Sequence, residues 1–273
     1  MTECLQELII SLLHKMERPE PWGLFHTLFF VIGIPLAILT AFLLHGLSKK
    51  GERRLFLWVG SFLLISELFK QLAYTAIEGS YRFDLIPFQL CSIPMYLCLA
   101  LAVIPEGRLT RFSVAARTFI ATFGLMGGLA SYISPATMCR DWLELTLHSF
   151  IWHLLLIFLG AYVFFSGNSS FERKDFPSAL LLYFSLCLIA LAINLVCINT
   201  PGADVNMFYI GPKPSILPIC RDITARFGVF FNSAVYVFSL SLCAYLIFLL
   251  ERLIKKNIKV KTTGRAGGLH KPP

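Results

Sequence analysis

The chain is short of charge. Only 15% of its 273 residues are Asp, Glu, Lys or Arg, whereas 56% are hydrophobic. A soluble domain of this size carries about a quarter charged residues, so an apolar solvent must surround much of this chain. The net charge of +8 comes from short basic clusters between long apolar runs. Since these clusters form no single basic face, the composition argues against nucleic acid as a partner.

Motifs for metals and cofactors are missing as well. None of the eight cysteines forms a CxxC pair, which argues against a zinc site. No glycine-rich dinucleotide or phosphate loop is present, so the sequence predicts neither a cofactor nor a metal. The longest loop between apolar runs, 199–226, has 28 residues, which leaves no room for a soluble domain.

Long apolar runs are what the chain has in abundance. Each approaches the roughly 20 residues that a helix needs to cross the hydrocarbon core, where only helices satisfy the backbone of such runs. We therefore expect an all-α polytopic membrane protein, with seven transmembrane helices in a membrane domain over 22–254. The expected spans are 23–46, 55–77, 87–104, 113–133, 142–166, 177–198 and 227–251.

The two ends of the chain flank this domain. Within an N-terminal segment, 1–21, the apolar residues of 4–16 recur at helical spacing, which predicts a short helix lying on the membrane surface. The tail, 255–273, is basic. The loops on one side of the expected spans carry, with this tail, 15 lysines and arginines, against 7 on the other side. The positive-inside rule then predicts the N-terminus outside and the tail in the cytoplasm, facing anionic lipid.

Polar side chains inside apolar runs are costly in lipid, so they are candidates for function. Counting about 1.5 Å per residue from the helix ends, we expect most of them at one level in the outer half of the bundle. This predicts one polar cavity that opens outward, covered by the proline-rich loop 199–226 as a lid. The candidate substrate-binding residues are Glu67, Lys70, Gln71, Gln89, His153, Asn194, Asn206 and Asn232.

A cysteine and a histidine at matching depth suggest nucleophilic chemistry. Cys91 and His148 lie on different expected helices, and Glu144 precedes His148 by one helical turn. The three form a candidate Cys-His-Glu catalytic arrangement for acyl transfer or hydrolysis on a lipid, with Lys70 or Gln89 steadying an oxyanion. The alternatives are structural: Cys91 as a small packing residue, the histidines as interhelical hydrogen-bond partners, and Glu67 with Lys70 as a buried ion pair.

Two further features concern packing and covalent links. Gly124, Gly127 and Gly128 predict close helix packing. Cys139 and Cys220 both fall in expected outer loops, where a disulfide is an open possibility.

Several segments, in order along the chain, resemble those of one family. They are 85–93 (LIPFQLCSI), 123–129 with Ser134 and Pro135, 147–153 (LHSFIWH), and 206–209 with Lys213 and Pro214. Together they resemble the YwaF-like integral membrane family, a bacterial group, over nearly the whole chain. That family is similar to eukaryotic multi-pass proteins that include cysteine-dependent phospholipid acyltransferases.

The resemblance implies a role for two residues and a location. Cys91 would be the nucleophile and His148 its partner, in the cytoplasmic membrane of a bacterium, with membrane lipids as partners. One residue departs from the pattern, because bacterial members often have a histidine where this chain has Gln89. If that histidine moves the proton, this chain binds its ligand without chemistry. A small-solute or lipid binding or transport protein, and a structural or sensory membrane protein, are therefore the alternatives to an enzyme.

Overall fold

The structure is a computed structural model of the chain, and it describes residues 3–104, 110–166, 171–200, 204–212 and 218–267. Within these ranges all regular elements are helical, apart from one isolated β-bridge between Lys15 and Trp142. The all-α expectation is thus confirmed for the described part of the chain.

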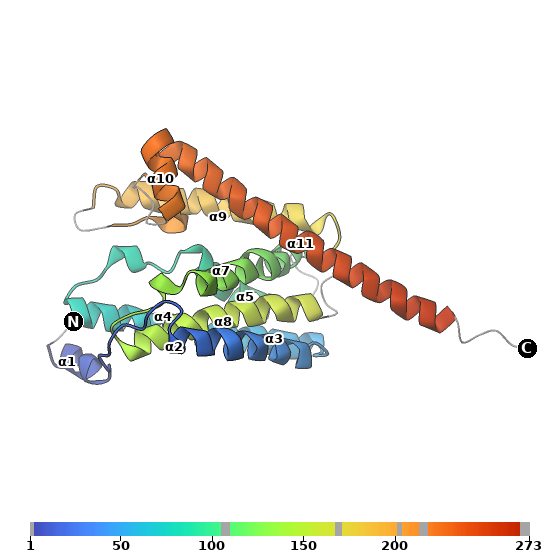
Figure 1. Cartoon of the computed structure of the whole chain (residues 1–273), viewed down its shortest axis with the longest axis horizontal. Coiled ribbons are helices and arrows are strands. Elements are labelled where there is room, and N and C mark those ends of the chain that lie inside the picture. The colour runs from blue at the N-terminus through green and yellow to red at the C-terminus, as the bar shows by residue number, and fades with distance from the viewer. Residues whose placement is uncertain (1–2, 105–109, 167–170, 201–203, 213–217, 268–273) are drawn as a thin grey trace, which may run out of the picture.

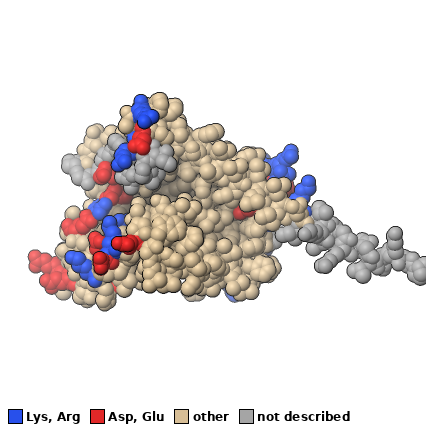
Figure 2. All heavy atoms as spheres, in the orientation of Figure 1, with Lys and Arg blue, Asp and Glu red and all other residues tan. Residues whose placement is uncertain are grey.

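Six helices in the described residues are long and apolar enough to cross a membrane. Figure 2 agrees with this assignment, because charged side chains gather at the two ends of the molecule and the surface between them is almost bare of charge. Two of the six contain a π turn, Phe29–Gly33 and Ile120–Gly124, between their α segments. The six are α2 to α3 (Leu24–Leu28 and Ile34–Leu43), α4 (Lys49–Glu78), α6 to α7 (Thr110–Phe119 and Leu125–Ile133), α8 (Leu143–Phe165), α9 (Asp175–Cys197) and α11 (Val229–Gly267).

The run expected as a span at 87–104 is shorter than predicted. Its helix begins only at a 3-10 turn, Leu90–Ser92, and continues as α5 (Ile93–Val103). Fourteen residues rise about 21 Å, short of the roughly 30 Å hydrocarbon core. The backbone is still extended at Gln89, with ψ of 159°, and Pro94 lies in the first turn of α5, where proline is tolerated.

The bundle has two distinct ends, which we call the α1 end and the tail end (Figure 1). The α1 end carries α1 (Glu3–Ser11), α10 (Pro218–Phe227) and the loop 204–212. The tail end carries the start of α4, and α11 runs obliquely across the bundle and beyond it there. At the tail end, Ser48 caps the start of α4 by accepting a hydrogen bond from the Gly51 amide. At the opposite end of the same helix, Gly79 ends α4 in a left-handed conformation with φ of 72°.

The N-terminal helix is shorter than the 4–16 predicted. It ends at Ser11, and the following residues are extended and pair with the start of α8: the Leu143 amide donates to the His14 carbonyl. Leu13 is buried against Ala73 and Leu145, whereas Leu8 and Leu12 are more than half exposed. This segment is therefore docked on α4 and α8 with an apolar face turned outward.

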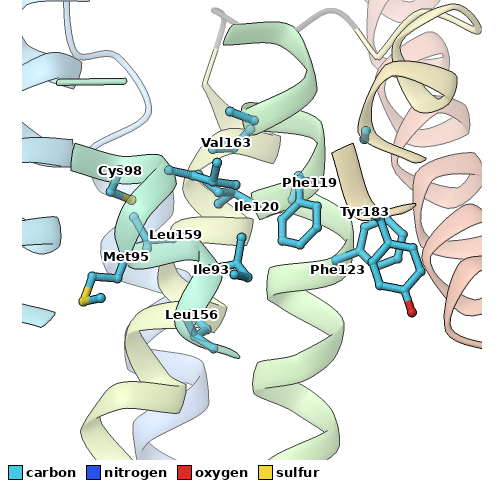
Figure 3. Close-up of a cluster of buried hydrophobic side chains, with 14 of the residues drawn as sticks. Ile93, Met95, Cys98, Phe119, Ile120, Phe123, Leu156, Leu159, Val163 and Tyr183 are labelled. Carbon is cyan, nitrogen blue, oxygen red and sulfur yellow. The ribbon is translucent and has the colours of Figure 1, made fainter. Parts of the chain in front are cut away.

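The main core lies between α5, α6, the π turn Ile120–Gly124, α8 and α9 (Figure 3). Tyr183 of α9 stacks on Phe123, with ring centroids 4.5 Å apart. Glycines allow helices to approach closely: a Cβ at Gly128 would lie 2.8 Å from Ile157, and one at Gly124 would lie 3.3 Å from Pro94. The packing role predicted for Gly124 and Gly128 is confirmed, but Gly127 has open space around its Cα.

Candidate functional site

Cys91 lies in the 3-10 turn that precedes α5, where it is partly buried and packs against the main core. Its carbonyl accepts a hydrogen bond from the indole Nε1 of Trp152, at 3.0 Å. The Trp152 ring also lies beside the His148 imidazole, with centroids 5.3 Å apart. Trp152 thus contacts both members of the candidate pair and brings the two segments together. Sequence reasoning missed Trp152, although it follows His148 by four residues and so shares its helix face.

His148 is held by Ser66 of α4. Its Nδ1 lies 2.6 Å from the Ser66 hydroxyl oxygen, and its Nε2 makes no hydrogen bond within the described residues. This geometry leaves Nε2 available to a ligand. It also replaces the partner predicted from sequence, because Glu144 was expected to orient this ring.

Glu144 instead holds the N-terminal segment. Its two carboxylate oxygens accept from the His14 ring Nδ1 at 2.6 Å and from the His14 amide at 2.9 Å. The prediction that Glu144 orients His148 is therefore wrong in its geometry. The helical spacing of four was correct, but a side chain at the first turn of α8 lies at the bundle end, where the docked chain supplies a nearer partner.

Glu67, Lys70 and Gln71 form a polar group on one face of α4, as their spacing predicts. The Glu67 carboxylate is buried and accepts from the Lys70 ammonium at 2.8 Å and from the Gln71 amide at 2.6 Å. Gln71 also donates to the Leu85 carbonyl, while its own Oε1 is buried without a partner. Lys70 lies within electrostatic range of Cys91, His148 and His153, so its charge acts on the whole site.

Two polar residues expected to line the cavity are engaged by the loop 204–212. Gln89 donates to the Asn206 carbonyl at 3.2 Å and accepts from the Phe208 amide at 3.0 Å. Asn194 is buried and accepts from the Met207 amide at 2.6 Å while donating to the Met207 carbonyl at 3.0 Å. Both side chains therefore hold the loop backbone rather than facing open space.

The loop itself enters the bundle. Met207 and Phe208 are buried in the main core, and the Asn206 side chain accepts from the Gly211 amide at 2.8 Å. Phe208 and Tyr209 both have positive φ, of 56° and 54°, a strained conformation for residues with side chains. The bonds and burial just described help to keep this conformation in place. The described part of the expected lid is thus a plug packed beside the site.

Tyr209 and Arg140 both lie within electrostatic range of the candidate pair. Burial raises the pKa of the Tyr209 hydroxyl, neighbouring Cys91 raises it further, and Arg140 opposes the shift. Arg140 is also within electrostatic range of His148. From the sequence, Arg140 counted only as a loop charge. Nothing in the residue spacing predicts that the turn before α8 comes within electrostatic range of His148 and Tyr209.

The other expected residues lie around this centre. The His153 Nδ1 bonds to the Ser149 carbonyl one turn earlier, at 2.7 Å, which is a bond within its own helix. Asn232 is buried on α11, and its Oδ1 has no partner. Cys139 is a free thiol, so the disulfide considered with Cys220 is not formed. Among the described residues, no three His, Cys, Asp or Glu side chains are grouped as metal ligands.

Comparison with known proteins gives one match. The model of the TMEM164 family matches residues 17–251, a range that includes every site residue described above. No curated protein and no solved structure matches the chain. The resemblance drawn from the motifs is confirmed at the level of a multi-pass membrane protein family.

Proposed function

The chain belongs to the TMEM164 family of multi-pass membrane proteins, and from this premise we propose that it is a cysteine-dependent lipid acyltransferase or lipid hydrolase. One observation carries the proposal: Trp152 joins the Cys91 backbone to the His148 ring, with the Lys70 ammonium in electrostatic range of both residues. A nucleophile, a base and a positive charge at one partly buried position are what thiol acyl chemistry needs.

In the proposed first step, the Cys91 sulfur attacks the carbonyl carbon of an acyl ester. The thiol proton moves to His148 Nε2, the ester C–O bond breaks, and the leaving alkoxide takes that proton. For Nε2 to accept a proton, Nδ1 must carry the ring hydrogen and donate it to Ser66. Ser66 therefore takes the orienting role that the sequence assigned to Glu144.

Lys70 has two compatible tasks in this step. Its ammonium favours the Cys91 thiolate, and it stabilises negative charge on an oxyanion or a headgroup phosphate. Glu67 keeps Lys70 in place through their 2.8 Å contact. Because Gln89 is bonded to the loop backbone, it contributes by holding the plug, not by contacting the oxyanion.

We further propose the orientation and location that follow from the sequence. The α1 end, with the site, faces outward, and the basic tail lies in the cytoplasm. The motifs shared with the YwaF-like family support the cytoplasmic membrane of a bacterium.

The test compares cells that carry the wild type, Cys91→Ala or His148→Ala at matched membrane abundance, by lipid mass spectrometry. Cys243→Ala is the control, because this cysteine is exposed on α11, away from the site. We expect the abundance of one lipid class to differ from the wild type in both site variants and to match the wild type in the control. Identical lipids in all four strains would remove the catalytic proposal.

A specific observation favours a second function, the binding or transport of a small solute. Gln71 Oε1 is a buried acceptor without a partner beside the Glu67 and Lys70 pair, so a polar solute has a group to bind. In that case Cys91→Ala leaves ligand binding intact, whereas Gln71→Leu weakens it.

A further inference from the structure

A second polar wall faces the site from α11 and the plug. It consists of Asn232 and Tyr236 on α11 and Tyr209 of the loop 204–212, and we call it the neutral wall because it contains no charged group. Asn232 and Tyr236 are one helical turn apart, so they share a face of α11. The Tyr209 and Tyr236 rings meet edge to face, with centroids 6.2 Å apart.

The neutral wall reaches Cys91. Gln89, two residues before Cys91, accepts a hydrogen bond from the Phe208 amide at 3.0 Å, so the next residue, Tyr209, and its ring partner Tyr236 lie near Cys91. Cys91 and Tyr236 also pack against the same core. The charged residues Glu67 and Lys70 come from α4, which lies on the other side of the bundle from α11 in Figure 1. Cys91 therefore has charged groups on the α4 side and uncharged groups on the α11 side.

The polar groups of the neutral wall are unused. Asn232 is only 2% exposed, yet its Oδ1 has no hydrogen-bond partner in the described part of the chain. Neither the Tyr209 nor the Tyr236 hydroxyl has a hydrogen-bond partner among the described residues. Native structures pair nearly all buried polar groups, so an unpaired buried amide beside a nucleophile indicates a place for a ligand.

The chemistry of the wall limits what that ligand is. Amide and phenol groups offer donors and acceptors without charge, which suits a hydroxyl group that both donates and accepts. None of these three residues supplies a counter-charge to an amine or a carboxylate.

We propose that Asn232 and Tyr236 form an acceptor subsite that holds an uncharged hydroxyl group beside Cys91. This inference rests on the proposed acyl chemistry and names its second substrate as an alcohol or water. The hydroxyl oxygen attacks the thioester carbonyl, the new C–O bond forms and the C–S bond breaks. The hydroxyl proton passes to His148 and from there to the Cys91 sulfur, which restores the thiol.

The experiment separates the two halves of the reaction in purified protein in nanodiscs. The acyl donor is p-nitrophenyl octanoate, whose nitrophenol burst reports acylation of Cys91. Monoacylglycerol in the nanodisc and water labelled with oxygen-18 are the two sources of hydroxyl. The variants are Asn232→Leu and Tyr236→Phe, and Tyr245→Phe, a half-exposed tyrosine on the same helix, is the control.

We expect both subsite variants to keep the burst within about twofold while release of the acyl group slows about tenfold, because one hydroxyl-positioning bond is lost. Slower formation of the new ester identifies the lipid alcohol as the acceptor, and slower formation of labelled octanoic acid identifies water. Unchanged release in both variants overturns the subsite while leaving the acyl chemistry standing. A wild type without any burst overturns the proposed function, and the subsite with it.

Discussion

Helix α4 carries two buried carboxylates in ion pairs, one near its start and one in its second half, and the two pairs differ in where the positive partner comes from. At the tail end Glu52, 1% exposed, pairs with Arg117 of α6. Fifteen positions later, Glu67 pairs with Lys70 of the same helix. Arg117 and Lys70 have equal side-chain exposure, 19%, so burial does not distinguish the pairs.

The difference lies in what each pair connects. Arg117 joins α4 to α6 and its guanidinium lies over the Phe56 ring, while neighbouring Arg53 donates twice to the Ala102 carbonyl of α5. These contacts tie three helices together. The Glu67 pair ties no two helices, so the Lys70 charge acts on Cys91 and His148 instead. We infer that the tail end holds the bundle and the α1 end serves the site.

The largest effect is expected from Arg117→Leu. It takes the Arg117 guanidinium away from the buried Glu52 carboxylate, and breaking such a pair costs about 3–5 kcal/mol. Thermal unfolding in detergent micelles, followed by dye labelling of the buried Cys98 thiol, measures the loss. Adding Glu52→Gln should recover part of the stability, since no unpaired charge then stays buried. A loss no larger than that of Lys70→Met would break the comparison.

Lys70→Met should have the opposite profile. The free energy of unfolding falls by about 1–3 kcal/mol, because Glu67 keeps its bond from Gln71 and no interhelical contact is lost. Alkylation of Cys91 should slow about tenfold at neutral pH, since the nearby positive charge that favours the thiolate is gone. The rate is followed by mass spectrometry of the Cys91 peptide. Unchanged alkylation would mean that the Lys70 charge does not reach the thiol.

Gln89→Leu tests how the loop 204–212 is held at the α1 end. The variant removes two bonds to the loop backbone and leaves the Phe208 amide unpaired, at about 1–3 kcal/mol. The strained Phe208 and Tyr209 should then leave the core more often. Hydrogen exchange of residues 204–212 should speed up, while exchange in α6 stays as in the wild type. Asn194→Leu removes the other clamp and should act in the same direction.

The smallest effect is expected from Glu144→Gln. His14 is 75% exposed, so its pair with Glu144 is screened and contributes less than about 1 kcal/mol. Proteolysis within residues 3–16 should increase slightly, while Cys91 alkylation stays unchanged. A fall in Cys91 reactivity as large as that of His148→Ala would restore the Cys-His-Glu arrangement predicted from sequence.

The sequence was sufficient to predict those features that the surrounding lipid requires. Lipid leaves no partner for an unpaired backbone group, so the long apolar runs had to be helices, and their polar residues had to turn inward. For this reason Cys91, His148 and Lys70 could be selected as candidate site residues from the sequence. At 87–104 the structure has a helix shorter than the expected span, because hydropathy does not register that the backbone is still extended at Gln89.

Tertiary structure decided which polar group meets which. Spacing along one helix placed Glu144 near His148, but a docked segment 130 residues away in sequence supplies His14 instead, and Ser66 reaches His148 from α4. Gln89 and Asn194 looked alike as cavity residues, yet both bond to a loop backbone that no periodicity positions. A hydrogen bond requires its donor and acceptor, here on separate segments, to be placed within a few tenths of an ångström of the ideal distance. Composition and spacing determine only which segments are able to meet.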